Sequence, residues 1–431
     1  CYLRGLIYAN QSNFERAKDA YKEALLIDVK CYEAFHELVS NQLMTPREEW
    51  EFIALLNYRV VEDNEDLVRL LYTTQLSKYK HPDSCTEAVQ ILDEEYGLVG
   101  NPDILLSKAD LLHVQCKFDE CMKVCEQLFA LDPFFLKAVP LQLASMYELR
   151  ARNKLFLRAH QLAEQHPQSP VTWLAIAIYY FSIGKIIEAR KFFLKSTLLN
   201  PNFGQAWIGF AHTFAVEGEH EQAISAYAFA ARVFPGTHLP NLFLGMQHLQ
   251  MGNLQLLEEY LLALYQICTT DPLLRNELGV VSYHRGRLQM AEQYCREALG
   301  AAKYLNSDLK TWVLIHTNLG HILRRLGQPH KALECFKQVL KLLNRDDGNV
   351  LAAIGLVYLK LGKHLKAIDV LHDALAVAPT DPIALDLLKR ALNENLTASD
   401  GDFFSRACGS LELNLEHQAH RAEKWQHGWR T

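Results

Sequence analysis

The sequence predicts an all-α fold built from stacked helix pairs, and two regular spacings carry this prediction. Four prolines recur at one constant interval: Pro133, Pro167, Pro201 and Pro235. Four glycines keep the same interval: Gly184, Gly218, Gly252 and Gly286. A fixed period of about 34 residues is typical of a solenoid and is the period of the tetratricopeptide repeat (TPR). We therefore expect a right-handed TPR superhelix, an α-solenoid.

The segment from Trp173 to Pro201 illustrates one repeat. Apolar side chains fall at i, i+3, i+4 and i+7 of its first helix, at Trp173, Ile176, Ala177 and Tyr180. Gly184 ends this helix, because glycine tolerates the left-handed backbone of a helix stop. Ala189 and Phe193 lie four residues apart on one face of the second helix. Pro201 then interrupts the chain before the next repeat.

The spacing of glycine and proline residues divides the chain into three parts. Residues 1–100 form an N-terminal TPR block whose pattern becomes irregular after about residue 40. Residues 101–397 continue the superhelix, and residues 398–431 read as a flexible or atypical tail. The interval from Gly286 to Gly327 is longer than the others, so seven extra residues are expected near 302–310.

Composition excludes several functional classes. The 431 residues are 49% hydrophobic and carry a net charge of −6, with no basic stripe of the kind that binds nucleic acid. The longest apolar stretch, Val171–Ile183, is shorter than the roughly 20 residues of a membrane span. Ten cysteines without paired spacing favour buried free thiols. Because Cys1 stands where a Met is expected, we expect a fragment of a longer protein.

A concave groove lined by first helices is the expected binding surface. The candidates are first-helix residues that point away from the packing positions: Gln205, Ile208, His212, Leu239, Leu242, Met246, Leu249, Asn276, Val280, Tyr283, Thr317, His321 and Arg324. The apolar middle of this set predicts a hydrophobic peptide as ligand. The alternative is that Leu239, Leu242 and Met246 are core residues of an irregular repeat.

Motifs for metal binding and catalysis fail on inspection. Cys116, Cys121 and Cys125 lie near His113, but two of these thiols occupy core positions of a second helix. His36-Glu37 begins a zinc-protease motif, yet Ser40 stands where the second histidine belongs. No nucleophile elbow or dinucleotide fingerprint occurs. We expect no enzyme activity, no metal and no cofactor.

Particular stretches resemble a known family beyond the repeat itself. They are Cys1–Gly5, Tyr21–Leu25, Cys31–Phe35, Ala206–Ala215, Glu217–His220, Thr237–Pro240, Glu277–Val281 and Asn318–His321. Many of these residues are not TPR consensus positions. Over about residues 1–396 the chain resembles the TPR scaffold subunit six of the anaphase-promoting complex (cyclosome), the cell-division-cycle sixteen type, in its fungal form.

The resemblance implies a structural subunit of a large E3 ubiquitin ligase that acts in mitosis, located in nucleus and cytoplasm. It implies other subunits of the complex as partners, with catalysis left to them. It also implies that the full-length form is a homodimer and that the superhelix wraps a peptide of a small accessory subunit, here along Leu239–Arg324. Neither nucleic acid nor membrane is an expected partner.

Three other protein classes share the repeat. A co-chaperone TPR adaptor clamps a peptide carboxylate with Lys and Asn, whereas Leu174, Ile178, Ile208 and His212 occupy the corresponding sites. The TPR arm of a glycosyltransferase needs a catalytic domain that does not fit in this length. A sister TPR subunit of the same ligase is disfavoured by the stretch around Trp207.

Overall fold

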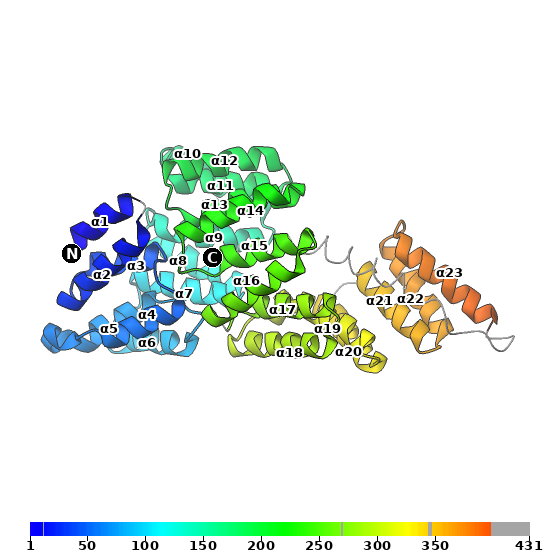
Figure 1. Cartoon of the computed structure of the whole chain (residues 1–431). Coiled ribbons are helices and arrows are strands. Elements are labelled where there is room, and N and C mark those ends of the chain that lie inside the picture. The colour runs from blue at the N-terminus through cyan, green and yellow to red at the C-terminus, as the bar shows by residue number, and fades with distance from the viewer. Residues whose placement is uncertain (12, 269, 344–346, 398–431) are drawn as a thin grey trace. The chain divides into compact units, whose positions relative to one another are not determined.

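The computed structural model describes residues 1–11, 13–268, 270–343 and 347–397. Within these ranges it holds 23 α-helices and three short 3-10 helices, and no strand (Figure 1). The all-α prediction is therefore confirmed. The predicted tail, residues 398–431, lies outside the described residues. None of the described helices is both long and apolar enough to cross a membrane.

The chain divides into two compact units, one over Cys1–Asp271 and one that begins at Pro272. The helices of unit 1 are α1 Tyr2–Asn10, α2 Phe14–Ile27, α3 Tyr32–Ser40, α4 Pro46–Leu55, η1 Tyr58–Asn64, α5 Glu65–Gln75, α6 Pro82–Glu94, α7 Pro102–Val114, α8 Phe118–Leu131, η2 Leu136–Ala138, α9 Val139–Glu148, α10 Arg152–Gln165, α11 Pro170–Ser182, α12 Ile186–Leu199, α13 Gly204–Glu217, α14 His220–Val233, α15 Leu239–Gln250 and α16 Leu254–Ile267.

Unit 2 continues the same pattern of helix pairs. Its helices are α17 Pro272–His284, α18 Leu288–Tyr304, η3 Leu309–Trp312, α19 Val313–Arg325, α20 Pro329–Leu343, α21 Gly348–Lys360, α22 His364–Val377 and α23 Pro382–Thr397. The seven extra residues expected near 302–310 fall at the end of the long helix α18 and in the turn before η3.

Each unit is a stack in which odd-numbered helices come first in a pair and even-numbered helices second. In unit 1 the first helices α5, α7, α9, α11 and α13 contact one another in sequence, and each packs on its own partner. The ribbon shows these pairs following one another through the blue, cyan and green part of the chain (Figure 1). First helices therefore line one side of the stack, as the TPR pattern predicts.

The repeated tryptophans and prolines form a joint between neighbouring repeats. Trp173 donates its indole N–H to the carbonyl oxygen of Pro167 at 3.0 Å. Trp207 makes the same bond to Pro201 at 2.8 Å. Both bonds join the first helix of a repeat to the end of the repeat before it. At these two joints the tryptophan lies six residues after the proline, and its indole N–H bonds to the proline carbonyl oxygen.

The repeated turn has a left-handed backbone, and two positions keep it without glycine. Gly184, Gly218 and Gly252 have φ of 81°, 79° and 77°. Cys116 and Arg150, which precede Gly184 by two intervals and by one, have φ of 58° and 53°. A side chain in this conformation is strained, since Cβ crowds the following carbonyl. The left-handed turn therefore recurs at the same interval upstream of Gly184, at positions where the sequence has no glycine.

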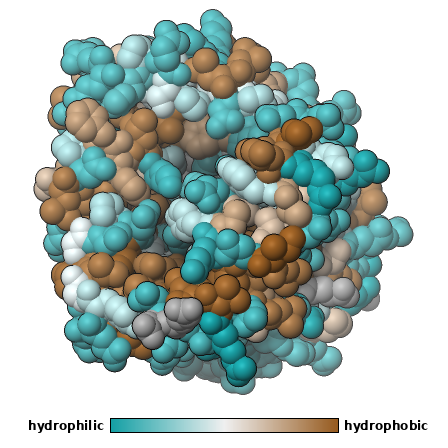
Figure 2. All heavy atoms as spheres, turned by 90° about the vertical axis from the view of Figure 1, so that its left-hand side faces the viewer, coloured by the Kyte–Doolittle hydropathy of each residue, from teal (hydrophilic) through white to brown (hydrophobic). Residues whose placement is uncertain are grey.

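The first helix pair has exposed apolar side chains. Leu3 and Ile7 on α1 and Ile27 on α2 are more than half exposed, at 72%, 56% and 69%. Figure 2 views the molecule from the side on which α1 and α2 lie in Figure 1, and small hydrophobic groups there alternate with hydrophilic ones. An end helix of a stack has a neighbour on one side only, which accounts for this exposure.

Candidate functional site

Unit 1 holds a partly open cavity of about 580 Å³ along the inner side of its first helices. One wall comes from α3, α5 with the turn after it, and α7, and a second wall from α11, the turn before α13, α13 and the start of α15. Residues of η2 and the start of α9 complete the lining. Tyr32, His36, Lys78, Asp103 and Asp110 belong to the first wall. Asn202, Gln205, Ile208, Thr237 and Leu239 belong to the second. One wall is therefore charged and the other largely neutral.

Lys78 is the buried cation of the cavity wall, with 2% of its surface exposed. Its ammonium group donates to the carbonyl oxygens of Leu76, at 2.9 Å, and of Thr74. Ser107 on α7 donates to the same Thr74 carbonyl, which ties α7 to the end of α5. These bonds replace the water that the ammonium group loses on burial.

Two carboxyl groups lie near Lys78 and respond to burial. Glu49 on α4 is 5% exposed and accepts the backbone N–H of Ser77 at 2.9 Å. Burial raises the pKa of Glu49 to about 7, although this bond and Lys78 oppose the change. Burial likewise raises the pKa of Asp110, with Lys78 again opposing it. The Asp110 side chain lines the cavity.

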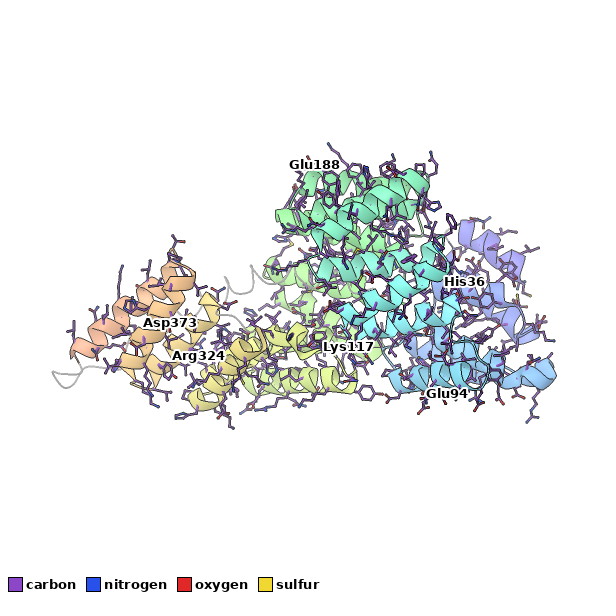
Figure 3. The ribbon with its side chains drawn as sticks, turned by 180° about the vertical axis from the view of Figure 1, so that it is seen from behind. His36, Glu94, Lys117, Glu188, Arg324 and Asp373 are labelled. Carbon is purple, nitrogen blue, oxygen red and sulfur yellow. The ribbon has the colours of Figure 1, made fainter. Side chains whose placement is uncertain are left out.

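The α3 part of the wall is polar but uncharged at neutral pH. The His36 ring stacks on Tyr32, with centroids 5.9 Å apart, and its Nδ1 lies 3.1 Å from Ser40 Oγ. Burial and the nearby Lys137 lower the pKa of His36 (labelled in Figure 3). Gln75 donates to the Tyr32 hydroxyl at 3.0 Å. Donors and acceptors of nearly balanced charge suit the main chain of an extended peptide.

Three of the predicted groove residues line this cavity. Gln205 is half-buried, Ile208 is 8% exposed and Leu239 is 1% exposed. Their neighbour His212 is buried against the Tyr227 hydroxyl and the Phe243 ring, whose centroid lies 4.8 Å away. On α15, Leu242 and Met246 are buried and Leu249 is half-buried. Contact of these seven residues with a partner stays a prediction.

The other six predicted groove residues lie on α17 and α19 of unit 2. Asn276 is fully buried, where its amide donates to Glu277 at 3.2 Å and its carbonyl oxygen accepts from Asn318 at 3.0 Å. Four further candidates are buried: Val280, Tyr283, Thr317 and Arg324. Burial and Arg324 lower the pKa of His321 to about 3. Whether any of the six contacts a partner is likewise still a prediction.

The charged wall is the part of the cavity that the sequence pattern did not reveal. The repeat loses its phase over residues 41–100, so the first helices there were not aligned with the later ones. A signal was present, because Asp103, Ser107 and Asp110 fall at i, i+4 and i+7 on one face of a first helix. Polar residues at the positions of an inward face are the pattern that would have identified it.

The cysteines near His113 occupy the core positions assigned to them. Cys121 and Cys125 on α8 are fully buried, and Ser145 donates to the Cys121 sulfur at 3.3 Å. His113 is also buried and meets the Phe118 ring edge to face at 5.4 Å. Among the residues that the structure describes, no three metal-ligating side chains come together.

Comparison with known proteins identifies the repeat and its relatives. The tetratricopeptide-repeat models match residues 1–30, 270–345 and 312–380. The chain is 48% identical over 93% of its length to anaphase-promoting complex subunit Cut9 of Schizosaccharomyces pombe, covering 60% of that protein. It is 43% identical to subunit CDC16 of Saccharomyces cerevisiae, covering 93% of the chain and 47% of CDC16. For the human cell division cycle protein 16 homolog, identity is 34%, with 90% and 62% covered.

A solved structure gives the same result in three dimensions. In the crystal structure of the hetero-tetramer of Cut9 and Hcn1 from the anaphase-promoting complex, the matched chain superposes with a TM-score of 0.78 at 47% identity. The match covers 91% of this chain and 75% of the solved one. This chain spans about half to three fifths of the length of the curated relatives named above. It belongs to the Cut9/CDC16 family of anaphase-promoting complex subunits.

Proposed function

We propose that this chain is a non-catalytic scaffold of the anaphase-promoting complex ubiquitin ligase and holds a small accessory subunit of that complex. The cavity of unit 1 carries the proposal, because peptide-binding solenoids hold their ligands against first helices. The solved relative is a complex of Cut9 with Hcn1, which supports a small partner of the Hcn1 kind. A structural role is supported by the packing of the predicted sites, whose cysteines and histidines serve the core.

The cavity fits a segment of extended chain better than a helix. Its wall offers the Asp110 carboxyl and the Gln205 amide, which can pair with main-chain N–H and C=O groups. The volume of about 580 Å³ lies in the range of sites that hold a few side chains. Leu239, the first residue of the groove stretch expected from the family resemblance, also lines the cavity.

Titration calorimetry of this chain with Hcn1 tests the proposal. Gln205→Trp fills the cavity from its neutral wall and is expected to weaken binding by more than about tenfold, since each 1.4 kcal/mol lost is a factor of about ten. Gln161→Trp is the matched control, because Gln161 is exposed on the second helix α10. Equal affinity of the folded Gln205→Trp variant and wild type would remove the cavity as the site, and no binding by wild type would remove the partner.

Two further parts of the proposal concern the whole protein. We propose that the full-length form is a homodimer, which a hetero-tetramer made of two kinds of chain supports. Light scattering of the full-length protein measures this directly, and a monomer at micromolar concentration would contradict it. We also propose that the protein resides in nucleus and cytoplasm, which imaging of a fluorescent fusion checks.

A further inference from the structure

Two parts of unit 1 that are distant in sequence meet along a line that we call the seam. One side of the seam is residues 42–44 and Tyr79, and the other side is residues 236–238 and 270–271. The backbone N–H of Gly236 donates to the carbonyl oxygen of Gln42 at 2.7 Å. Thr270 donates its hydroxyl to the carbonyl oxygen of Tyr79 at 2.5 Å. Unit 1 therefore closes on itself, since 191 positions of sequence separate this last pair.

Gly236 is required at the seam because of how closely the two backbones approach. A Cβ atom at this position would lie 2.2 Å from the carbonyl oxygen of Met44 and 2.3 Å from that of Gln42. Both neighbours are backbone atoms, so no side chain can rotate away to make room. Any larger residue at position 236 must push the two sides apart.

A buried pair supports one side of the seam. His238 and Asp271 are each 2% exposed at their side chains and are joined by a hydrogen bond of 2.8 Å between Nε2 and Oδ2. This bond ties the start of α15 to the segment after α16. The edge of the His238 ring also meets Tyr79 across the seam, with centroids 5.2 Å apart and planes at 88°. This side of the seam is thus held together by a buried hydrogen bond of its own.

The seam is part of the cavity wall. Asn41 and Gln42 line the cavity from one side of the seam, and Phe234, Thr237 and Leu239 line it from the other. Separating the two sides would therefore widen the cavity where these residues line it. The bonds that cross the seam join loops and helix ends, where local opening requires less free energy than global unfolding.

We propose that the seam is a lateral entrance to the cavity. A partner chain enters and leaves sideways when the two sides of the seam separate, and the closed seam retains the bound chain. The partner side of this inference rests on the proposed function. A chain that instead threaded lengthwise would slide past both walls and would be indifferent to the seam. A closed seam is expected to lower the dissociation rate of the partner without any added contact between partner and wall. Differences in affinity between related complexes lie mostly in the dissociation rate.

The opening of the seam is measured without any partner. Gln205→Cys places a thiol on the cavity wall, and its labelling by N-ethylmaleimide is compared with labelling by a bulky polyethylene-glycol maleimide, read by mass spectrometry of the peptide. We expect the bulky reagent to react about tenfold more slowly than the small one, and Gly236→Val to raise its rate at least about threefold. Gly100→Val is the matched control, because a Cβ there meets no atom within 4 Å.

Two measurements keep the inference testable if Gly236→Val does not fold. Hydrogen exchange on wild type is expected to show the Gly236 amide protected at least about tenfold relative to the Gly100 amide. Thr270→Val keeps the side-chain shape, removes the bond to Tyr79 and is expected to reduce that protection. Equal exchange of the two amides in wild type, or equal labelling of Gln205→Cys by both reagents when Gly236 is kept, would overturn the proposal.

The partner experiment separates this inference from the proposed function. The dissociation rate of Hcn1 is measured by surface binding for wild type, Thr270→Val and Gly100→Val. We expect release to be at least about threefold faster for Thr270→Val alone, with little change in association. An unchanged dissociation rate with an opened seam would mean that the partner threads lengthwise, which would overturn the lateral entrance. Failure of Hcn1 to bind wild type would remove the proposed function while the labelling result stands.

Discussion

The two walls of the cavity in unit 1 come from regions built on different rules. The region from α11 to α14 repeats its core at the constant interval of the prolines, with Ala189 and Ala223 both fully buried at equivalent sites. The region from α3 to α7 lost that pattern and instead buries charged groups, among them Glu49 and Lys78. Within unit 1 the region from α11 to α14 thus builds a regular apolar core, whereas the irregular region from α3 to α7 buries charged groups.

The largest expected effect tests the regular region through its core. Phe193 is fully buried between α11 and α12. Phe193→Ala is expected to lower the free energy of unfolding by about 3–5 kcal/mol, because it removes a ring and leaves a cavity. Urea unfolding followed by tryptophan fluorescence measures this. A loss below about 1 kcal/mol would mean that the repeat core contributes less than regular packing requires.

The second largest expected effect is a pH dependence of stability that comes from Glu49, a buried acid of the α3–α7 region. Glu49 has a pKa of about 7 in the folded chain against an ordinary value of 4.5, so the folded state holds a proton that the unfolded state releases. Stability is therefore expected to fall as the pH rises from 4.5 to 7, by about 3 kcal/mol from this group, since one pKa unit corresponds to about 1.4 kcal/mol.

Glu49→Gln isolates that contribution. The amide oxygen still accepts the Ser77 N–H but does not ionise, so this part of the pH dependence is expected to disappear and stability at pH 8 to rise. Unfolding midpoints of both proteins across the pH series measure the difference. The matched control is Glu51→Gln on the same helix, whose carboxylate is exposed. Parallel curves for Glu49→Gln and wild type would show that Glu49 is not the titrating group.

The smallest effect tests where the two regions join. Arg150 is exposed and has a left-handed backbone at the turn where the next repeat has Gly184. Arg150→Gly is expected to stabilise unit 1 by about 0.5–1 kcal/mol, since strain is relieved at some cost in chain entropy. Gly184→Ala is expected to act in the opposite direction by a similar amount. Thermal unfolding of the pair decides, and a destabilised Arg150→Gly would contradict a shared turn.

The fold could be predicted from the sequence because each regularly spaced glycine or proline has a direct structural role. Gly184 marks a left-handed turn and Pro201 receives the Trp207 indole bond, so each spacing reports one joint. The charged wall did not follow, since the repeat loses its phase over residues 41–100, which hold Lys78. The seam lay beyond sequence reasoning because Gln42 and Gly236 are brought together only by the accumulated rotation of several repeats.

The most direct test of the cavity as the binding site is photocross-linking from inside it. A photoreactive phenylalanine derivative replaces Gln205 on the cavity wall or Gln161 on the outer helix, and each protein is irradiated with Hcn1. We expect a cross-link from position 205 and none from position 161. A cross-link from position 161 alone, with Hcn1 bound, would place the partner on the outside of the coil and contradict a binding site within the cavity.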